Sequence, residues 1–157
     1  MTSSSVRCFS TQIERIFQSL EGAWSFERNI PSYGEVIGTA NFTRPSPNDC
    51  FYYYREEGII NRHEGGPLPF YRNYRYEYTD GQIRIFFDET PKRLFLNLHF
   101  RTDCTKADAE HLCNQDLYQA NYEFIDSATF KVTYIVQGPL KSYRLNTTYK
   151  KSGLKRI

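Results

Sequence analysis

The sequence lacks long apolar runs and any strong excess of one charge. No stretch of about 18 consecutive apolar residues occurs, which is the length that a membrane-spanning helix needs. The formal net charge is +2, from 20 basic and 18 acidic residues, and the longest basic runs are pairs such as Lys150-Lys151. Neither membrane insertion nor nucleic-acid binding is therefore expected.

The cysteine and leader patterns of secreted proteins are also missing. The four cysteines follow no CxxC or zinc spacing, and the N-terminus has no apolar core of a secretory signal. Reduced thiols and a cytoplasmic location are therefore expected. The alternative is a mitochondrial presequence cleaved after Phe9, because the first ten residues are rich in Ser and Thr, contain Arg7 and have no acid. Residues 1–9 are predicted to be a flexible terminus, and 10–157 a single domain.

Aromatic residues, by contrast, are abundant: the chain has 13 Tyr, 12 Phe and one Trp, together 17% of its residues. Such side chains favour the half-buried, pleated surface of a β-sheet, so this composition indicates a β-rich protein. Tyrosine carries a hydroxyl at the tip of an apolar ring. The 13 tyrosines are therefore suited to line a cavity that is apolar in body and polar at a few points.

The spacing of apolar residues changes from helical to alternating at Gly22. The segment 10–21 has a stripe at Ile13, Ile16, Phe17 and Leu20, which predicts one short helix. Downstream, alternation predicts about nine strands, with Asp80-Gly81 as the strongest hairpin turn. The expected strands are 22–30, 34–44, 50–58, 70–78, 82–89, 93–101, 111–125, 128–137 and 141–151. The segments 59–69 and 101–110 are expected to be loops.

The expected strands are joined by short connections, with no spacing of the βαβ kind. A meander of this type closes most economically into an up-and-down antiparallel barrel, which removes the exposed edges of a sheet. A two-sheet sandwich is the alternative, but no connection is long enough for a Greek-key crossover. We therefore predict a single all-β barrel of about nine strands with one short N-terminal helix.

Five short motifs occur in order along the chain. They are GxWxFxRxI (Gly22, Trp24, Phe26, Arg28, Ile30), YxExG (Tyr54, Glu56, Gly58), RxYxY (Arg72, Tyr74, Tyr76), HxCxxDxY (His111, Cys113, Asp116, Tyr118) and GPxKxY (Gly138, Pro139, Lys141, Tyr143). In these motifs nearly the whole chain resembles a lipocalin-like family of the calycin type that is known only as a domain of unknown function. Leu96 and Tyr134 depart from that pattern, which has histidine and tryptophan there. The resemblance implies a calycin barrel and supplies no function.

Metal and thiol chemistry are weakly indicated. His111 and Cys113 lie two apart on an expected strand and face the same side, with His99 and His63 as further candidate ligands. Zinc needs three or four convergent ligands, so packing of Cys113 as a small apolar residue is the favoured interpretation. Neighbours two apart on a strand lie about 7 Å apart, too far for a thiol and its base. His63, the haem candidate, falls in a loop rich in Gly and Pro, so no metal, haem or other cofactor is predicted.

Charged residues on the expected strands point instead to a binding site, because a charge inside a barrel must be paired or meet a polar ligand. In this hypothesis Trp24 and Phe26 form the floor of the barrel, while His111 and Asp116 form a polar pair near its mouth. Basic residues fix an anion and tyrosines orient the ligand. The candidate binding residues are Arg28, Tyr54, Arg72, Tyr76, His111, Asp116, Tyr118, Lys141 and Tyr143.

Three functions remain open at this point. The first is a non-enzymatic barrel, monomer or weak dimer, that binds a small aromatic or amphipathic molecule with an anionic group. The second is a cofactor-free enzyme in the same pocket, decarboxylase-like or chromophore-lyase-like, as the calycin resemblance implies. Its candidate catalytic residues are Glu56, Asp116 and His111. The third is a structural role, which requires a filled interior with every charge paired.

Overall fold

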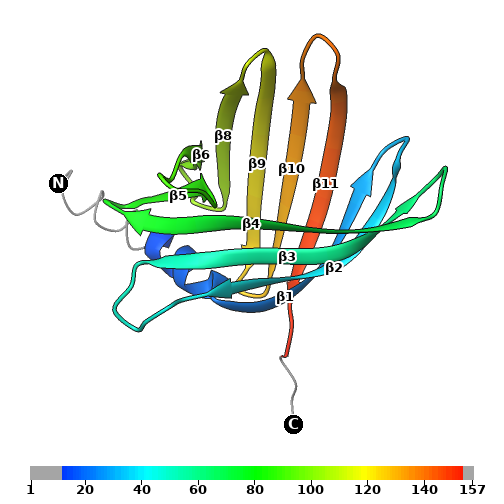
Figure 1. The fold of residues 1–157 in the computed structure, drawn as a ribbon. Coiled ribbons are helices and arrows are strands. Elements are labelled where there is room, and N and C mark those ends of the chain that lie inside the picture. Colours follow the sequence, from blue (N-terminus) through cyan, green and yellow to red (C-terminus); the bar gives the residue numbers. More distant parts are fainter. Residues whose placement is uncertain (1–11, 154–157) are drawn as a thin grey trace.

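One antiparallel sheet of eleven strands curls into a nearly closed up-and-down barrel, with a short helix at one end (Figure 1). This is a computed structural model, and it describes residues 12–153. The predicted all-β barrel with one N-terminal helix is confirmed, and the sandwich alternative is wrong because the structure has a single sheet. The predicted flexible segment 1–9, with its alternative as a presequence, lies outside the described residues.

The strands lie side by side in chain order, except that the sheet begins at β6 and ends at β7, in the order β6-β5-β4-β3-β2-β1-β11-β10-β9-β8-β7. Their bounds are β1 (Gly22–Ile30), β2 (Gly34–Thr43), β3 (Phe51–Arg62), β4 (Pro67–Thr79), β5 (Gln82–Phe87), β6 (Leu94–Asn97), β7 (His99–Phe100), β8 (Lys106–Cys113), β9 (Asp116–Asp126), β10 (Thr129–Gln137) and β11 (Ser142–Lys151). Because β6 and β7 are neighbours in the chain, the two edges of the sheet come close to each other there and leave the barrel nearly closed.

The core follows from the period-2 alternation of the strands. On β1, Trp24 and Phe26 point inward and are buried, and Arg28 continues the same face. On β3, Tyr52 and Tyr54 are buried in the same way, and Glu56 continues that face with only 2% exposure. The alternation that builds the apolar core therefore also carries charged residues into the barrel.

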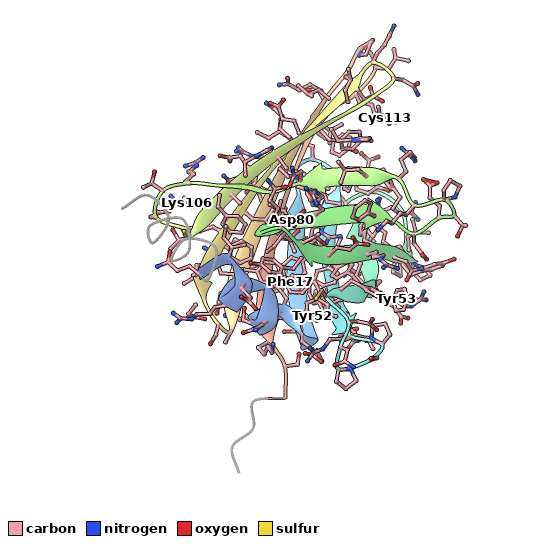
Figure 2. The ribbon with its side chains drawn as sticks, turned by 90° about the vertical axis from the view of Figure 1, so that its left-hand side faces the viewer. Phe17, Tyr52, Tyr53, Asp80, Lys106 and Cys113 are labelled. Carbon is pink, nitrogen blue, oxygen red and sulfur yellow. The ribbon has the colours of Figure 1, made fainter. Side chains whose placement is uncertain are left out.

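The helix (residues 12–20) closes one end of the barrel. Its Phe17 ring stacks on Tyr52 with ring centroids 4.4 Å apart, and the Tyr52 hydroxyl donates to the Phe17 carbonyl at 2.8 Å. The indole Nε1 of Trp24 donates to the Leu20 carbonyl at 2.8 Å, which ties the end of the helix to β1. Figure 2 shows Phe17 and Tyr52 toward one end of the barrel and Cys113 toward the other. Within residues 12–153, no helix is long and apolar enough to cross a membrane.

The predicted strand 111–125 is wrong, because the structure has a hairpin there. β8 already begins at Lys106, inside the expected loop 101–110, and a two-residue turn at Asn114 and Gln115 separates it from β9. Asn114 has a φ of 58°, in the left-handed region that asparagine tolerates better than most residues. His111 is consequently the cross-strand partner of Tyr118, and Cys113 that of Asp116.

Two further strand predictions differ from the structure. The expected loop 59–69 is mostly strand: β3 continues to Arg62 and β4 begins at Pro67. Prolines are tolerated because β4 pairs with β5 only from Tyr74 onward, which leaves its first half at an edge among the described residues. The expected strand 93–101 divides at Leu98 into β6, which pairs with β5, and β7, which pairs with β8. This division and the β8–β9 hairpin account for the two strands beyond the nine predicted.

Gly38 on β2 provides a test of the packing. A Cβ atom at this position would lie 2.3 Å from the Glu57 carbonyl oxygen and 2.6 Å from Cζ of Phe26. Because neither a paired backbone nor a buried ring can move freely, Gly38→Ala should lower the free energy of unfolding by about 1–3 kcal/mol. Gly66→Ala is the matched control, since no atom lies within 4 Å of its added Cβ. Equal urea midpoints for the two variants would contradict this packing.

Candidate functional site

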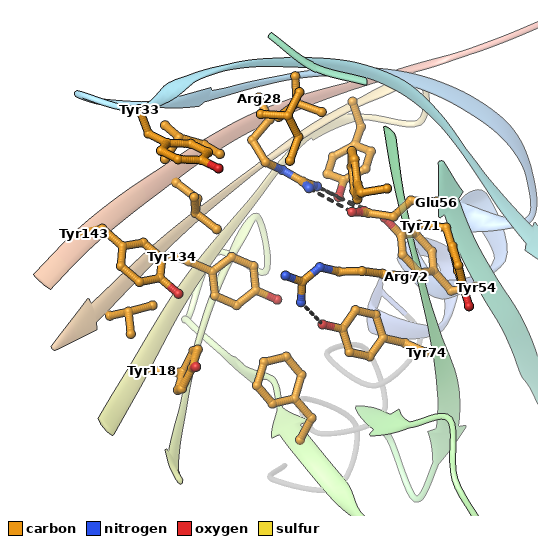
Figure 3. Close-up of a pocket in the computed structure, with 18 of the residues that line it drawn as sticks. Arg28, Tyr33, Tyr54, Glu56, Tyr71, Arg72, Tyr74, Tyr118, Tyr134 and Tyr143 are labelled. Carbon is orange, nitrogen blue, oxygen red and sulfur yellow. Dashed lines mark hydrogen bonds and ion pairs between the residues drawn. The ribbon is translucent and has the colours of Figure 1, made fainter. Parts of the chain in front are cut away.

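The end of the barrel opposite the helix holds a cavity of about 810 Å³ (Figure 3). Cavities of this size accommodate drug-sized molecules. Phe70, Phe95 and aliphatic side chains contribute apolar surface, and ten of the 13 tyrosines line the cavity. These are Tyr33, Tyr54, Tyr71, Tyr74, Tyr76, Tyr118, Tyr122, Tyr134, Tyr143 and Tyr149. The wall is therefore largely aromatic with hydroxyl groups distributed over it.

Three charged side chains line this cavity among the described residues: Arg28 from β1, Glu56 from β3 and Arg72 from β4. Each continues an inward-facing run of aromatic residues, so the pleat of its strand brings it inside. Glu56 and Arg72 are directly opposite in the register of β3 and β4. Two guanidinium groups and one carboxylate give the lining a formal charge of +1.

Arg28 and Glu56 form a buried ion pair with two parallel hydrogen bonds. The Arg28 Nη1 and Nη2 atoms donate to the two Glu56 carboxylate oxygens at 2.8 and 3.0 Å. The Arg28 Nε atom donates to Thr147 Oγ1 at 2.8 Å, and Nη2 also reaches the Tyr149 hydroxyl at 3.3 Å. Paired guanidinium and carboxylate groups in this fork geometry satisfy one another. The Nε, Nη1 and Nη2 atoms of Arg28 thus all have hydrogen-bond partners within the protein.

Tyr54 and Tyr149 complete this cluster in a defined order. Tyr54 donates its hydroxyl proton to Glu56, so at the 3.0 Å contact between the two hydroxyls Tyr149 must donate to Tyr54. Burial disfavours an ionised Glu56, but hydrogen bonds from Arg28 and Tyr54 and the charges of Arg28 and Arg72 outweigh it and lower the pKa of Glu56. Glu56 is therefore an ionised carboxylate that already accepts several hydrogen bonds.

Arg72 lies near this cluster but forms no ion pair with it. None of the ion pairs within residues 12–153 involves it. Its Nη1 atom donates a hydrogen bond of 3.4 Å to the Tyr74 hydroxyl, and Arg72 is exposed to solvent. Figure 3 shows its guanidinium in the middle of the cavity, between Tyr134 and Tyr74. Arg72 is thus the cation of the lining that has no carboxylate partner.

A second group of hydroxyls comes from β4, β9 and β10. The Tyr76 and Tyr122 hydroxyls are 3.1 Å apart, and Tyr122 is also hydrogen-bonded to Tyr134. Burial, together with the neighbouring tyrosines, raises the pKa of all three well above the ordinary value. These hydroxyls remain neutral at physiological pH and can donate or accept hydrogen bonds.

The structure brings six of the nine sequence-predicted binding residues into the lining and leaves three outside it. Tyr118 and Tyr143 line the cavity and are hydrogen-bonded to each other. Asp116 and Lys141 pair with each other at 3.3 Å and do not line the cavity. The expected polar pair of His111 and Asp116 is not formed. The six residues inside are Arg28, Tyr54, Arg72, Tyr76, Tyr118 and Tyr143.

His111 belongs to the barrel wall. Its ring packs edge-on against Phe95 and Phe87, with ring centroids 5.3 and 5.6 Å apart, where β8 faces β6. Burial and the charge of Arg93 lower the pKa of His111, which favours the neutral imidazole. His63 is exposed, and the described residues contain no group of three or more His, Cys, Asp or Glu side chains that could hold a metal ion.

Sequence reasoning missed several lining residues, among them Tyr122, Tyr134 and Tyr149. Tyr122 could have been predicted, because it lies four residues after Tyr118 on the same strand and therefore faces the same side. Tyr74 lies inside the RxYxY motif and was overlooked in the same way.

Residues 20–151 match a protein-family model described as "Family of unknown function (DUF6314)". No curated protein matches the sequence. The structure is similar to the S-type phycobiliprotein lyase CPES from Guillardia theta, with TM-score 0.61 and 11% identity over 91% of this chain and 94% of that chain. It is also similar to EF1p2_mFAP2b bound to DFHBI, with TM-score 0.52 and 14% identity over 89% and 99% of the two chains. At these identities the likeness concerns the fold.

Proposed function

Because the chain belongs to DUF6314, a family of unknown function, we propose its role from the pocket itself: the barrel binds a small aromatic or amphipathic molecule that carries an anionic group. Arg72 holds the anion, and the aromatic walls bury the apolar body. The role is binding rather than catalysis.

The observation that carries this proposal is the guanidinium of Arg72, which lines a cavity of about 810 Å³ and makes no ion pair within residues 12–153. The other two charges of the lining, Arg28 and Glu56, neutralise each other. One added negative charge would therefore balance the lining, and a guanidinium offers several donors to a carboxylate or similar group. The fold itself is compatible with a guest, since one solved barrel of similar fold is bound to DFHBI.

The two other roles have less support. A general acid needs a carboxyl group that keeps its proton near neutral pH. Glu56 has a lowered pKa and accepts hydrogen bonds from Arg28 and Tyr54, while Asp116 and His111 lie outside the lining. A purely structural role fits poorly with a cavity of this size.

Replacing Arg72 with Gln should weaken the binding of an organic acid by about 10–100-fold. A hydrogen bond between charged partners contributes about 1.5–3 kcal/mol, which sets this range. Anthracene-2-carboxylate serves as the aromatic probe and pentadecanoate as the amphipathic one, each titrated by calorimetry. Because Arg72 makes no ion pair among the described residues, the variant should melt close to the wild-type temperature.

Arg84→Gln is the matched control for this experiment. Arg84 lies on β5, donates to Gln82 Oε1 at 2.7 Å and is not part of the cavity lining, so its replacement should leave affinity unchanged. The proposal fails if the wild-type protein binds neither acid, or if Arg72→Gln binds both acids as tightly as the wild type does.

A further inference from the structure

Three rings of the pocket share nearly the same orientation. Tyr74 and Phe95 are 12° apart in plane with centroids at 5.5 Å, and Phe95 and Tyr134 are 8° apart with centroids at 6.3 Å. The rings come from β4, β6 and β10, three strands that converge on the cavity, and all three residues line it. Parallel rings of this kind present flat faces onto which a further ring can stack in an offset arrangement.

Arg72 lies at the edge of this set of rings. Its Nη1 atom is hydrogen-bonded to the Tyr74 hydroxyl at 3.4 Å, and a phenolic oxygen lies in the plane of its own ring. Figure 3 shows the guanidinium between Tyr74 and Tyr134. A group that projects in plane from a stacked ring would therefore reach Arg72, whereas one that projects from the face of the ring would not.

From this geometry we infer the class of ligand: a rigid, planar aromatic acid with a single negative charge in the plane of its ring system. The inference rests on the proposed binding function and decides between its aromatic and amphipathic forms. A single charge matches the formal +1 of the lining from Arg28, Glu56 and Arg72. A carboxylate conjugated to the ring lies in its plane and fits the donor fork of a guanidinium.

The competing class is a flexible alkyl acid, and the two classes make opposite predictions. An alkyl chain with the same number of carbon atoms carries more hydrogen and more apolar surface than a fused arene, so burial alone favours the alkyl acid. It also loses more conformational freedom on binding. A preference for the arene therefore requires the parallel ring faces, and not merely an apolar cavity.

The test compares anthracene-2-carboxylate with pentadecanoate, which have equal numbers of carbon atoms, by calorimetric titration of the wild-type protein. We expect the arene acid to bind at least about tenfold more tightly. Phe95→Leu removes the central flat face at little cost in volume and should reduce this preference to about threefold or less. Phe100→Leu is the control, because Phe100 stacks on Phe124 and is not part of the lining. Tyr134→Leu provides a second variant if Phe95→Leu does not fold.

The outcomes separate this inference from the proposed function. Equal or tighter binding of pentadecanoate, with both acids still weakened by Arg72→Gln, overturns the planar class and leaves the anion-binding pocket in place. An arene preference that persists in both Phe95→Leu and Tyr134→Leu also overturns it, because the ring faces would not be its source. If Arg72→Gln leaves the affinity for both acids unchanged, the proposed function itself is wrong.

Discussion

Replacing Glu56 with Gln is expected to lower the free energy of unfolding by about 3–5 kcal/mol, because it leaves the buried Arg28 guanidinium without a counter-charge. Arg28 and Glu56 are joined by two hydrogen bonds of 2.8 and 3.0 Å, and Glu56 is 2% exposed. The measurement is urea denaturation followed by circular dichroism. The expected loss concerns stability, since the ion pair is already satisfied within the fold.

Glu57→Gln is the matched control. Glu57 is the next residue on β3, faces solvent and pairs with Arg55 at 3.2 Å, so its loss should cost no more than about 1 kcal/mol. The double variant Arg28→Met with Glu56→Leu should recover most of the stability, because an apolar pair removes the unpaired charge. Similar unfolding midpoints for Glu56→Gln and Glu57→Gln would contradict a buried, stabilising pair.

The effect of Glu56→Gln should depend on pH in one direction. The folded-state pKa of Glu56 lies below its unfolded value, because hydrogen bonds and charge from Arg28 outweigh the cost of burial. The stabilisation is therefore complete above the unfolded pKa of about 4.3 and is lost as pH falls through the lower folded value. The stability difference between wild type and variant should shrink over that acidic range.

Trp24→Ala should cost about 3–5 kcal/mol in unfolding free energy. Trp24 is 1% exposed, packs edge-on against Phe130 with centroids 4.9 Å apart, and donates its indole hydrogen to the Leu20 carbonyl. Its removal would leave a large void and release the end of the helix from β1. Urea denaturation measures the loss in unfolding free energy, and protection of the helix amides from hydrogen exchange should fall as well.

Tyr53→Ala is the control for this second prediction. Tyr53 is also aromatic but is 51% exposed on the outer face of β3, so its loss should cost about 1 kcal/mol or less. A loss of under about 1 kcal/mol for Trp24→Ala would show that this residue does not support the closed end of the barrel.

The barrel could be predicted because its signal is local and repeated. Alternation on each strand fixes which residues face inward, as for Trp24, Phe26 and Arg28 on β1. The Asp80-Gly81 turn was equally readable, since both residues have positive φ angles of 55° and 74° and form a familiar hairpin pair. The expected resemblance to a domain of unknown function is matched by membership in DUF6314.

The hairpin of β8 and β9 was not predicted, because its turn has no clear local sequence signal. Asn114-Gln115 lacks the glycine that marks a two-residue turn, so β8 and β9 were read as one strand. That error placed His111 and Asp116 close together on one strand as a polar pair near the mouth, whereas they lie on two strands with different contacts. His111 packs into the barrel wall, and Asp116 pairs with Lys141.

The sequence does not show which of two arginines remains available to bind an anion. Arg28 and Arg72 both continue inward faces, and both were predicted to fix an anion. Strand register places Arg72 opposite Glu56, yet the Arg28 side chain, two strands away, takes both carboxylate oxygens. Which cation stays available depends on the reach of long side chains across the barrel, and that distance appears only in the folded structure.

The contribution of the Arg72 charge to ligand binding can be measured in a calorimetric cycle that changes the protein and the ligand separately. Anthracene-2-carboxylate and its primary amide, which has nearly the same shape and no charge, are titrated into wild type and Arg72→Gln. An ion pair with Arg72 predicts that the acid binds wild type at least about tenfold more tightly than the amide, and that this ratio falls to about one in the variant. The same ratio in both proteins would contradict anion binding by Arg72.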